Sequence, residues 1–237
     1  MNQLQARTTQ IYILVLSILA IYFCNLETII AGVVVGWVLQ GISLETLIHR
    51  KYAHNQFNYK NIFWEVACYI ILLSTSLGRP YEWSYGHRVH HRYTDQLNDP
   101  QSPHSIGILK TFFSVFPAGV KGWDGIDKDL RSQPRLMFFN KHYYKFYILY
   151  NIIWFTIDPV SALCFIGIPS LLAWLTLGII NTISHLEMYK PKDILFPLWF
   201  WGGNYHGTHH KFPNKTYLGP RDLSYFVIKI IGTENEK

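Results

Sequence analysis

The stretch YEWSYGHRVHH, residues 81–91, carries a His-x-x-His-His cluster. Residues three and four apart share one face of an α-helix, so His87, His90 and His91 can converge on one point. Neutral imidazole is the commonest metal ligand in proteins. We therefore expect this stretch to form a helix that presents metal ligands.

Three further histidine groups accompany this stretch. The His-x-x-His-His spacing recurs close to the C-terminus, a histidine pair lies five residues apart upstream, and a single histidine follows Asn181 by four residues. These groups comprise His206, His209 and His210, then His49 and His54, and finally His185. Nine of the eleven histidines thus fall into these groups. Histidines with unrelated roles at the surface or in the core would be scattered along the chain instead. His104 and His142 lie outside the groups, and we expect them to be ordinary polar residues.

The pair His49 and His54 has a spacing that a regular helix does not favour. Five residues of α-helix turn by about 500°, which leaves the two side chains about 140° apart. They can serve one site only if the helix ends or unwinds between them. We expect this where a membrane helix leaves the bilayer.

The distribution of basic residues predicts the membrane topology. The chain has 237 residues, is 49% hydrophobic and carries a formal charge of +6, yet no Lys or Arg occurs at 8–49 or 146–189. A spanning helix needs about 20 apolar residues, so each gap holds two spans joined by a turn. We predict spans at about residues 11–24, 29–47, 147–157 (extended by Tyr143 and Tyr144) and 162–184, with outer turns at Glu27 and Asp158.

All 21 Lys and Arg residues then lie on one side, which the positive-inside rule makes cytoplasmic. We predict an all-α membrane protein with one domain, residues 1–237. Two helical hairpins carry a cytoplasmic helical cap, residues 49–141 and 186–237, and both termini are cytoplasmic. The membrane would be the endoplasmic reticulum in a eukaryote or the inner membrane in a bacterium.

The apolar stretch 61–78 resembles a further span, but a crossing there would place His87–His91 opposite His49 and His54. We therefore expect a helix that is buried against other elements or lies at the interface with Glu65 on its polar side. Glu45 near the end of the second span is either functional or simply within reach of the interface. Cys24, Cys68 and Cys164 cannot supply a four-thiolate site, and we expect free buried thiols rather than a Cys24–Cys164 disulfide.

Nine imidazoles exceed the three or four ligands of one zinc site and indicate two metals. Zinc has no redox chemistry, whereas iron with open positions can activate dioxygen. A metal site beside apolar helices suits oxidation of a lipid chain. The chain has no flavin, nucleotide or haem motif, so electrons must come from another protein.

Together these motifs resemble the membrane fatty acid desaturase family, closest to the stearoyl-CoA (Δ9 acyl-CoA) desaturases. The resemblance rests on HRKYAH at 49–54, on YEWSYGHRVHH with YTD and NDP after it, on NTISH at 181–185, and on NYHGTHHKFP at 204–213. It extends from about residue 30 to 231. Three glycines, Gly86, Gly203 and Gly207, depart from the family pattern; at 203 the family often has an acid.

The resemblance implies a di-iron centre held by all nine clustered histidines, with Asn181 contacting one metal through water. It implies that dioxygen and two electrons convert a saturated C16–C18 acyl chain, with CoA as the expected carrier, to a cis-monoene. The expected partners are membrane lipid, the acyl substrate and an external small haem cytochrome or ferredoxin with its reductase; no nucleic acid is expected. Zinc acquired during overexpression would replace the iron without supporting activity.

Other expectations concern the cap and the competing functions. Five cations could hold a phosphorylated head group or could be ordinary surface charge: Arg88, Arg92, Lys110, Lys121 and Lys128. A helix from Leu223 would pack over the site, or simply into the core, through Phe226, Val227 and Ile230. The alternative function is a di-iron lipid hydroxylase or oxygenase. A membrane metal transporter is a remote alternative, because transport calls for polar residues at the midplane and the clusters lie at span ends.

Overall fold

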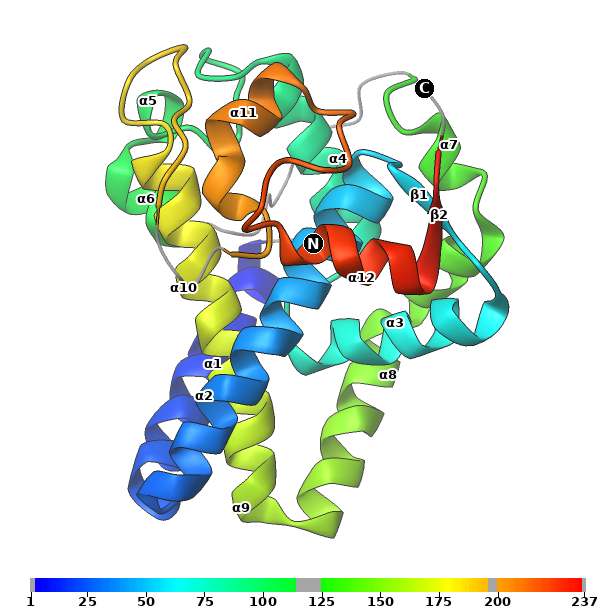
Figure 1. The fold of residues 1–237 in the computed structure, drawn as a ribbon. Coiled ribbons are helices and arrows are strands. Elements are labelled where there is room, and N and C mark those ends of the chain that lie inside the picture. Colours follow the sequence, from blue (N-terminus) through cyan, green and yellow to red (C-terminus); the bar gives the residue numbers. More distant parts are fainter. Residues whose placement is uncertain (1–2, 114–124, 196–199, 236–237) are drawn as a thin grey trace.

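The computed structural model describes residues 3–113, 125–195 and 200–235. Long helices lie side by side in the lower half of Figure 1, and shorter helices form a cap above them. The helix α1 starts at the cap end, and the last elements of the chain finish there. This part of the chain is mostly helical, which agrees with the all-α prediction except for one two-stranded sheet.

The long helices form two hairpins. The first consists of α1 (Gln3–Phe23) and α2 (Leu26–Gln40), which continues into the π-helix η1 (Gly41–Ala53). The second consists of α8 (Pro134–Ile157) and a continuous helix formed by α9 (Pro159–Ala162), η2 (Leu163–Gly167) and α10 (Ile168–Ile183). Asn25 accepts a hydrogen bond from the Thr28 amide, and Asp158 accepts one from the Val160 amide. These two caps start the second helix of each hairpin, as the predicted turns require.

Two helices of the described chain are long and apolar enough to cross a membrane: Leu26–Ala53, with 28 residues, and Pro159–Ile183, with 25. They include the predicted spans 29–47 and 162–184. The apolar part of α1, Arg7–Phe23, is shorter. The helix α8 begins well before the predicted position 147, and its outward face exposes Ile148, Ile152 and Ile157.

Glycines allow α2 to approach the second hairpin closely. A Cβ added at Gly32 would lie 3.1 Å from Cys164 Sγ, and one at Gly36 would lie 3.2 Å from the backbone of Pro169. Small residues permit this kind of backbone contact between membrane helices. Cys24, Cys68 and Cys164 are free and buried, as expected.

The helix α3 (Ile62–Ser74) lies across the long helices rather than along them (Figure 1). Its 13 residues are too few to span a bilayer, which requires about 20. Glu65 is buried, receives a hydrogen bond from the Tyr69 hydroxyl and pairs with Arg135 at 2.7 Å. Glu65 thus lies on the side of α3 that carries polar partners, while the opposite side exposes apolar residues such as Phe63 and Ile70.

The cap collects short helices and a small sheet. Its helices are α4 (Pro80–Arg92), α5 (Pro103–Ile106), α6 (Ile108–Phe113), α7 (Lys128–Arg131), η4 (Gly203–Tyr205), α11 (His206–Lys211) and α12 (Leu223–Ile231). The strands β1 (Phe57–Tyr59) and β2 (Gly232–Glu234) pair antiparallel, with Phe57 opposite Glu234. This pairing joins the C-terminal segment to the chain just after η1.

The helix α12 packs on η1, but not through all of the residues expected from the sequence. Phe226 and Ile230 are 53% and 58% exposed, whereas Ile228 is fully buried. The Thr46 hydroxyl also donates to Ser224 Oγ at 3.0 Å. The predicted helix is thus confirmed; of its three predicted contact residues, Val227 packs against the core, whereas Phe226 and Ile230 do not. Both faces are apolar, and helical periodicity does not say which one meets the protein.

Candidate metal centre

The nine clustered histidines gather into two groups, and no other group of three or more His, Cys, Asp or Glu in the described chain could hold a metal. Within each group the candidate ligand atoms lie within 4.8 Å of one another. The five-histidine cluster contains His49, His54, His87, His91 and His209; the four-histidine cluster contains His90, His185, His206 and His210. His104 and His142 belong to neither cluster.

Each His-x-x-His-His helix contributes to both clusters. In α4, His87 and His91 join the five-histidine cluster and His90 joins the other. In α11 the assignment is reversed, because His206 and His210 join the four-histidine cluster and His209 joins the five. Residues four apart share a helix face, while adjacent residues point about 100° apart. The two clusters are therefore neighbours, and the rings of His91 and His210 stack with centroids 4.3 Å apart.

The π-helix η1 explains how His49 and His54, five residues apart, reach the same cluster. The backbone N–H of His54 donates to the carbonyl of His49 at 3.0 Å, an i→i+5 hydrogen bond, and the helix ends at Ala53. A helical turn closed by an i→i+5 hydrogen bond contains about one residue more than an α-helical turn, so residues five apart lie near the same side of the helix. The two rings have centroids 4.8 Å apart. The expectation that the helix ends between the two histidines is confirmed, and its widening explains how both reach one cluster.

The ring nitrogens of both clusters face each other at short range. In the five-histidine cluster, Nε2 of His209 lies 3.0 Å from Nε2 of both His49 and His91. In the four-histidine cluster, His206 Nε2 lies 2.8 Å from His185 Nε2 and 3.1 Å from His210 Nε2. With metal–nitrogen bonds of about 2.1 Å, ligands at right angles are about 3.0 Å apart. The residues present therefore fit one metal ion in each cluster.

Buried carboxylates accept hydrogen bonds from the Nδ1 atoms of three of the imidazoles. Glu45 accepts from His49 Nδ1 at 3.0 Å, Asp99 from His90 Nδ1 at 2.8 Å, and Asp95 from His185 Nδ1 at 3.1 Å. An ionised carboxylate only accepts, so Nδ1 carries the proton and Nε2 is left with a lone pair toward the cluster. Such partners orient metal-binding imidazoles and raise their basicity.

The environment also keeps the imidazoles neutral. Burial, reinforced by the neighbouring imidazoles, lowers the pKa of His87, His206 and His209 well below its ordinary value. Burial lowers the pKa of His185 too, although the Asp95 carboxylate opposes the shift. Neutral imidazole is the form that binds metals, so the free side chains are ready for an ion.

Sequence reasoning did not identify two of the three carboxylates. Asp95 and Asp99 lie in the loop after α4, within the YTD and NDP motifs that contribute to the family resemblance, but these motifs did not identify them as partners of the histidines. Asp95 has a φ of 61° and is held by Ser102 Oγ and the Tyr189 amide. The usable signal was their position, since ligating histidines nearly always have such acceptors and both aspartates follow the cluster within a few residues.

Glu45 and Gly203 are spatially linked. A Cβ added at Gly203 would lie 2.6 Å from Glu45 Oε1, so the carboxylate behind His49 occupies the space beside this glycine. A side chain at Gly207 would instead meet the Pro191 carbonyl at 2.4 Å. Two of the glycines that depart from the family pattern therefore fit close local packing in this chain.

Arg88 has a structural role rather than a place on a head-group surface. Its guanidinium donates to the carbonyls of Tyr52 and Ala53 at the end of η1 and pairs with Asp129. These contacts satisfy carbonyls that a helix end leaves without partners. Arg88 thus connects the His54 end of η1 to α4.

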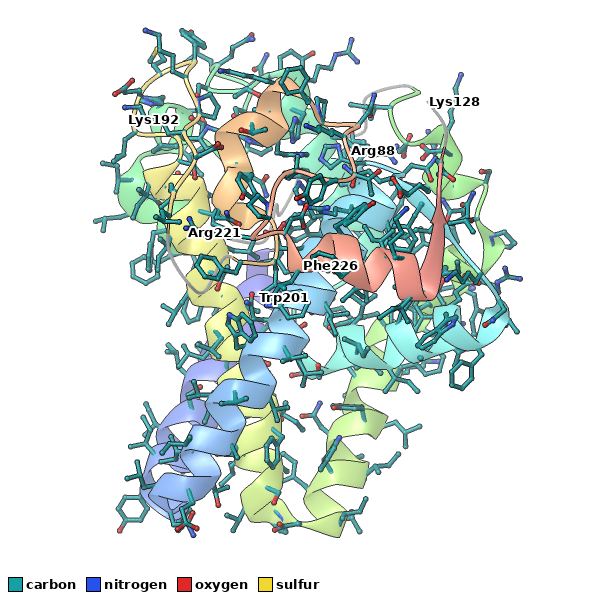
Figure 2. All side chains as sticks on the ribbon, in the orientation of Figure 1. Arg88, Lys128, Lys192, Trp201, Arg221 and Phe226 are labelled. Atoms are coloured by element: carbon teal, nitrogen blue, oxygen red, sulfur yellow. The ribbon has the colours of Figure 1, made fainter. Side chains whose placement is uncertain are left out.

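The other cations proposed for a head group do not gather. Lys110 in α6 and Lys128 in α7 lie on opposite sides of the cap (Figures 1 and 2), and Arg92 lies over the Tyr93 ring. Lys121 lies outside the described residues. For Lys110 and Lys128, the separation of α6 from α7 therefore favours ordinary surface charge over a shared head-group site.

Asn181 is buried on α10, one turn before His185. Near the four-histidine cluster, Ser184 Oγ and Asn204 Oδ1 are buried and make no hydrogen bond to the described residues. Such atoms commonly mark a position for water or an ion. His104 donates from its ring to the His185 carbonyl at 2.7 Å, so it supports the backbone of a cluster residue.

Comparison with known proteins agrees with this geometry. The fatty acid desaturase family matches residues 27–217. Delta-9 acyl-lipid desaturase 1 of Arabidopsis thaliana is 25% identical over 227 residues, covering 82% of this chain and 69% of the plant protein. Stearoyl-CoA desaturase of Capra hircus is 24% identical over 230 residues, covering 80% and 58%. Acyl-CoA Delta12-desaturase of Acheta domesticus is 25% identical over 213 residues, covering 75% and 57%. The resemblance seen in the histidine motifs is confirmed, and this chain belongs to the fatty acid desaturase family.

Proposed function

We propose that the protein introduces a cis double bond into a saturated C16–C18 acyl chain, using dioxygen and two electrons at a di-iron centre. The observation that carries this proposal is the division of nine histidines into two adjacent clusters with converging Nε2 atoms. Two neighbouring nitrogen-rich sites suit a pair of iron ions. Iron bound there would supply the oxidising power that removal of two hydrogens from an unactivated chain requires.

The side chains around the clusters would keep the ligands in place. Glu45, Asp95 and Asp99 hold three imidazoles with Nε2 directed into the clusters. Arg88 fixes the end of η1 against α4. Asn181 lies in the last turn of α10, four residues before His185, and would contact the four-histidine site through water.

The acyl chain would come from the membrane. We propose that α1, α2–η1, α8 and α9–α10 all span the bilayer, with the cap and both termini in the cytoplasm. The apolar exposed faces of α1 and α8 support the two spans that length and composition leave open. Because both clusters lie where the long helices meet the cap, a lipid tail can reach them while its head stays in water.

Electrons would come from a separate carrier. The net charge of +6 and the cationic cytoplasmic side favour an acidic partner such as a small haem cytochrome or a ferredoxin. Such a pairing predicts turnover that falls as salt concentration rises.

Expression in a host that lacks its own desaturase tests the proposal, with mass spectrometry of total fatty acids as the readout. We expect new cis-monoenes with the wild type and none with His90→Ala, while His142→Ala behaves as the wild type. Hydroxy acids without monoenes would assign the protein to the hydroxylases. Unchanged lipids, with iron bound and a competent donor present, would contradict both functions.

A further inference from the structure

Two cavities adjoin each other on the side of the molecule formed by α3, α7 and α8. The first has a volume of about 820 Å³ and lies between α3 and α8; the second, of about 530 Å³, lies above it beside β1 and α7. Pro134 and Arg135 line both. Each is within the range of ligand-binding pockets, about 300–1,000 Å³.

The lower cavity is an apolar groove. Its walls include Val66 and Ile70 from α3 and Phe138, Leu149 and Ile153 from α8. All five side chains are substantially exposed rather than packed into the core. An open groove of this kind on the outer face of a membrane protein accommodates a hydrocarbon chain.

The upper cavity is polar, and the cationic and anionic side chains that line it are equal in number. It is lined by the cations Lys51 and Arg135, the carboxylates Glu65 and Asp129, and amides such as Asn61. The Lys51 ammonium group already donates hydrogen bonds to the Phe57 carbonyl and to Asn58 Oδ1. A polyphosphate head group would need an excess of positive charge, which this lining does not provide.

Arg135 lies where the two cavities meet. It contacts Glu65 through Nε alone, and 67% of its side chain is exposed, so both Nη groups are available to an anion. Asp129 lines the upper cavity and its side chain is 41% exposed, so an ammonium group can approach it as a second cation beside Arg88, which already donates to both of its oxygens. The cavities thus present, in order, an apolar groove, a site for a phosphate and a site for an ammonium group.

We propose that these two cavities together bind one membrane phospholipid with a zwitterionic head group. One acyl tail lies in the groove between α3 and α8, the phosphate contacts Arg135, and the ammonium group points toward Asp129. None of the nine clustered histidines lines either cavity. The bound lipid is therefore a resident of the fold and separate from the acyl chain at the metal centre.

Native mass spectrometry of the full-length protein, stripped of lipid in detergent and titrated with dioleoyl phosphatidylcholine, tests this site. We expect one tightly bound phosphatidylcholine, and at least tenfold weaker binding in Arg135→Ala. Ile70→Trp, which fills the groove from an exposed position, should weaken binding to a similar extent without disturbing the Glu65 pair. Val34→Trp is the matched control, because Val34 is exposed on α2, away from both cavities.

The outcomes separate this site from the proposed reaction. Iron content and desaturation by Ile70→Trp should remain at the wild-type level while phosphatidylcholine binding falls. Equal binding by all four proteins would overturn the site, and a preference for phosphatidylglycerol would overturn the charge argument. Loss of turnover in Ile70→Trp with iron still bound would identify the groove as the substrate path instead.

Discussion

Asp99 receives hydrogen bonds from His90 Nδ1 and from the backbone amides of Asp95 and Gln101. At the scale of single residues, its carboxylate accepts from three donors, as many as that of Asp95. Asp99→Asn keeps the shape but removes the charge and introduces an amide group. We expect iron affinity to fall by roughly 10–100-fold. Iron retained after dialysis against a chelator measures this, and Asp158→Asn, at the outer turn, should retain as much iron as the wild type.

Gly203 and Glu45 allow a second test at this scale. Gly203→Ala places a methyl group against Glu45 Oε1 and should destabilise the fold by about 1–3 kcal/mol. In a Glu45→Ala background the same substitution should cost much less, because the crowding atom is gone. Thermal unfolding of the four proteins gives the coupling. An identical cost in both backgrounds would mean that contact with Ile180, also near this position, dominates.

Six of the nine clustered histidines could be predicted from sequence as one kind of site, because the His-x-x-His-His spacing occurs twice, whereas His49, His54 and His185 lack that spacing. Their carboxylate partners could not be assigned in the same way. Asp95 lies 90 residues before His185 in the chain and meets it only after the loop behind α4 has folded over α10. Contacts of this kind depend on tertiary packing, which no local spacing encodes.

At the scale of helices, Arg88 connects η1 with α4. One guanidinium donates to the Tyr52, Ala53 and Ile126 carbonyls and to Asp129. A lysine ammonium cannot make this planar set of contacts, so Arg88→Lys should lower the free energy of unfolding by roughly 2–4 kcal/mol. Thermal unfolding is the measurement. Arg92→Lys is the matched control, and equal losses in both variants would contradict the connecting role.

The widened helix η1 shows why element types are harder to predict than element positions. The apolar pattern indicated a helix through residue 47, and the structure continues it to Ala53 with i→i+5 bonds. A π-helix has no distinct apolar period in a short segment. Only the demand that His49 and His54 share a site pointed to a departure from α-helical geometry.

At the scale of the whole molecule, the membrane topology can be tested directly. All three native cysteines are buried, so single cysteines introduced at exposed positions report alone. Glu27→Cys and Ile157→Cys should react with an impermeant thiol reagent from outside intact cells. Lys215→Cys in the cap should react only after the cells are opened. Labelling of Lys215→Cys from outside would place the cap on the wrong side.

The arrangement of spans illustrates what composition can predict. The cation-free gaps located both hairpin turns, because charges avoid the bilayer in any fold. The starting point of α8 could not be obtained this way. Its first turns contain Lys141 and Lys145, so their sequence is as polar as that of the cap. The helix nevertheless includes these turns because its inner face packs on α4 and α3.

The division of adjacent histidines between the two clusters has a consequence for iron uptake. His90 and His91 belong to different clusters, as do His209 and His210, so neither α4 nor α11 belongs to one cluster alone. Ordering either helix around a first ion pre-arranges ligands for the second, which lowers the entropic cost of the next binding step. Loading should therefore be positively cooperative, and protein holding a single ion should be scarce throughout a titration.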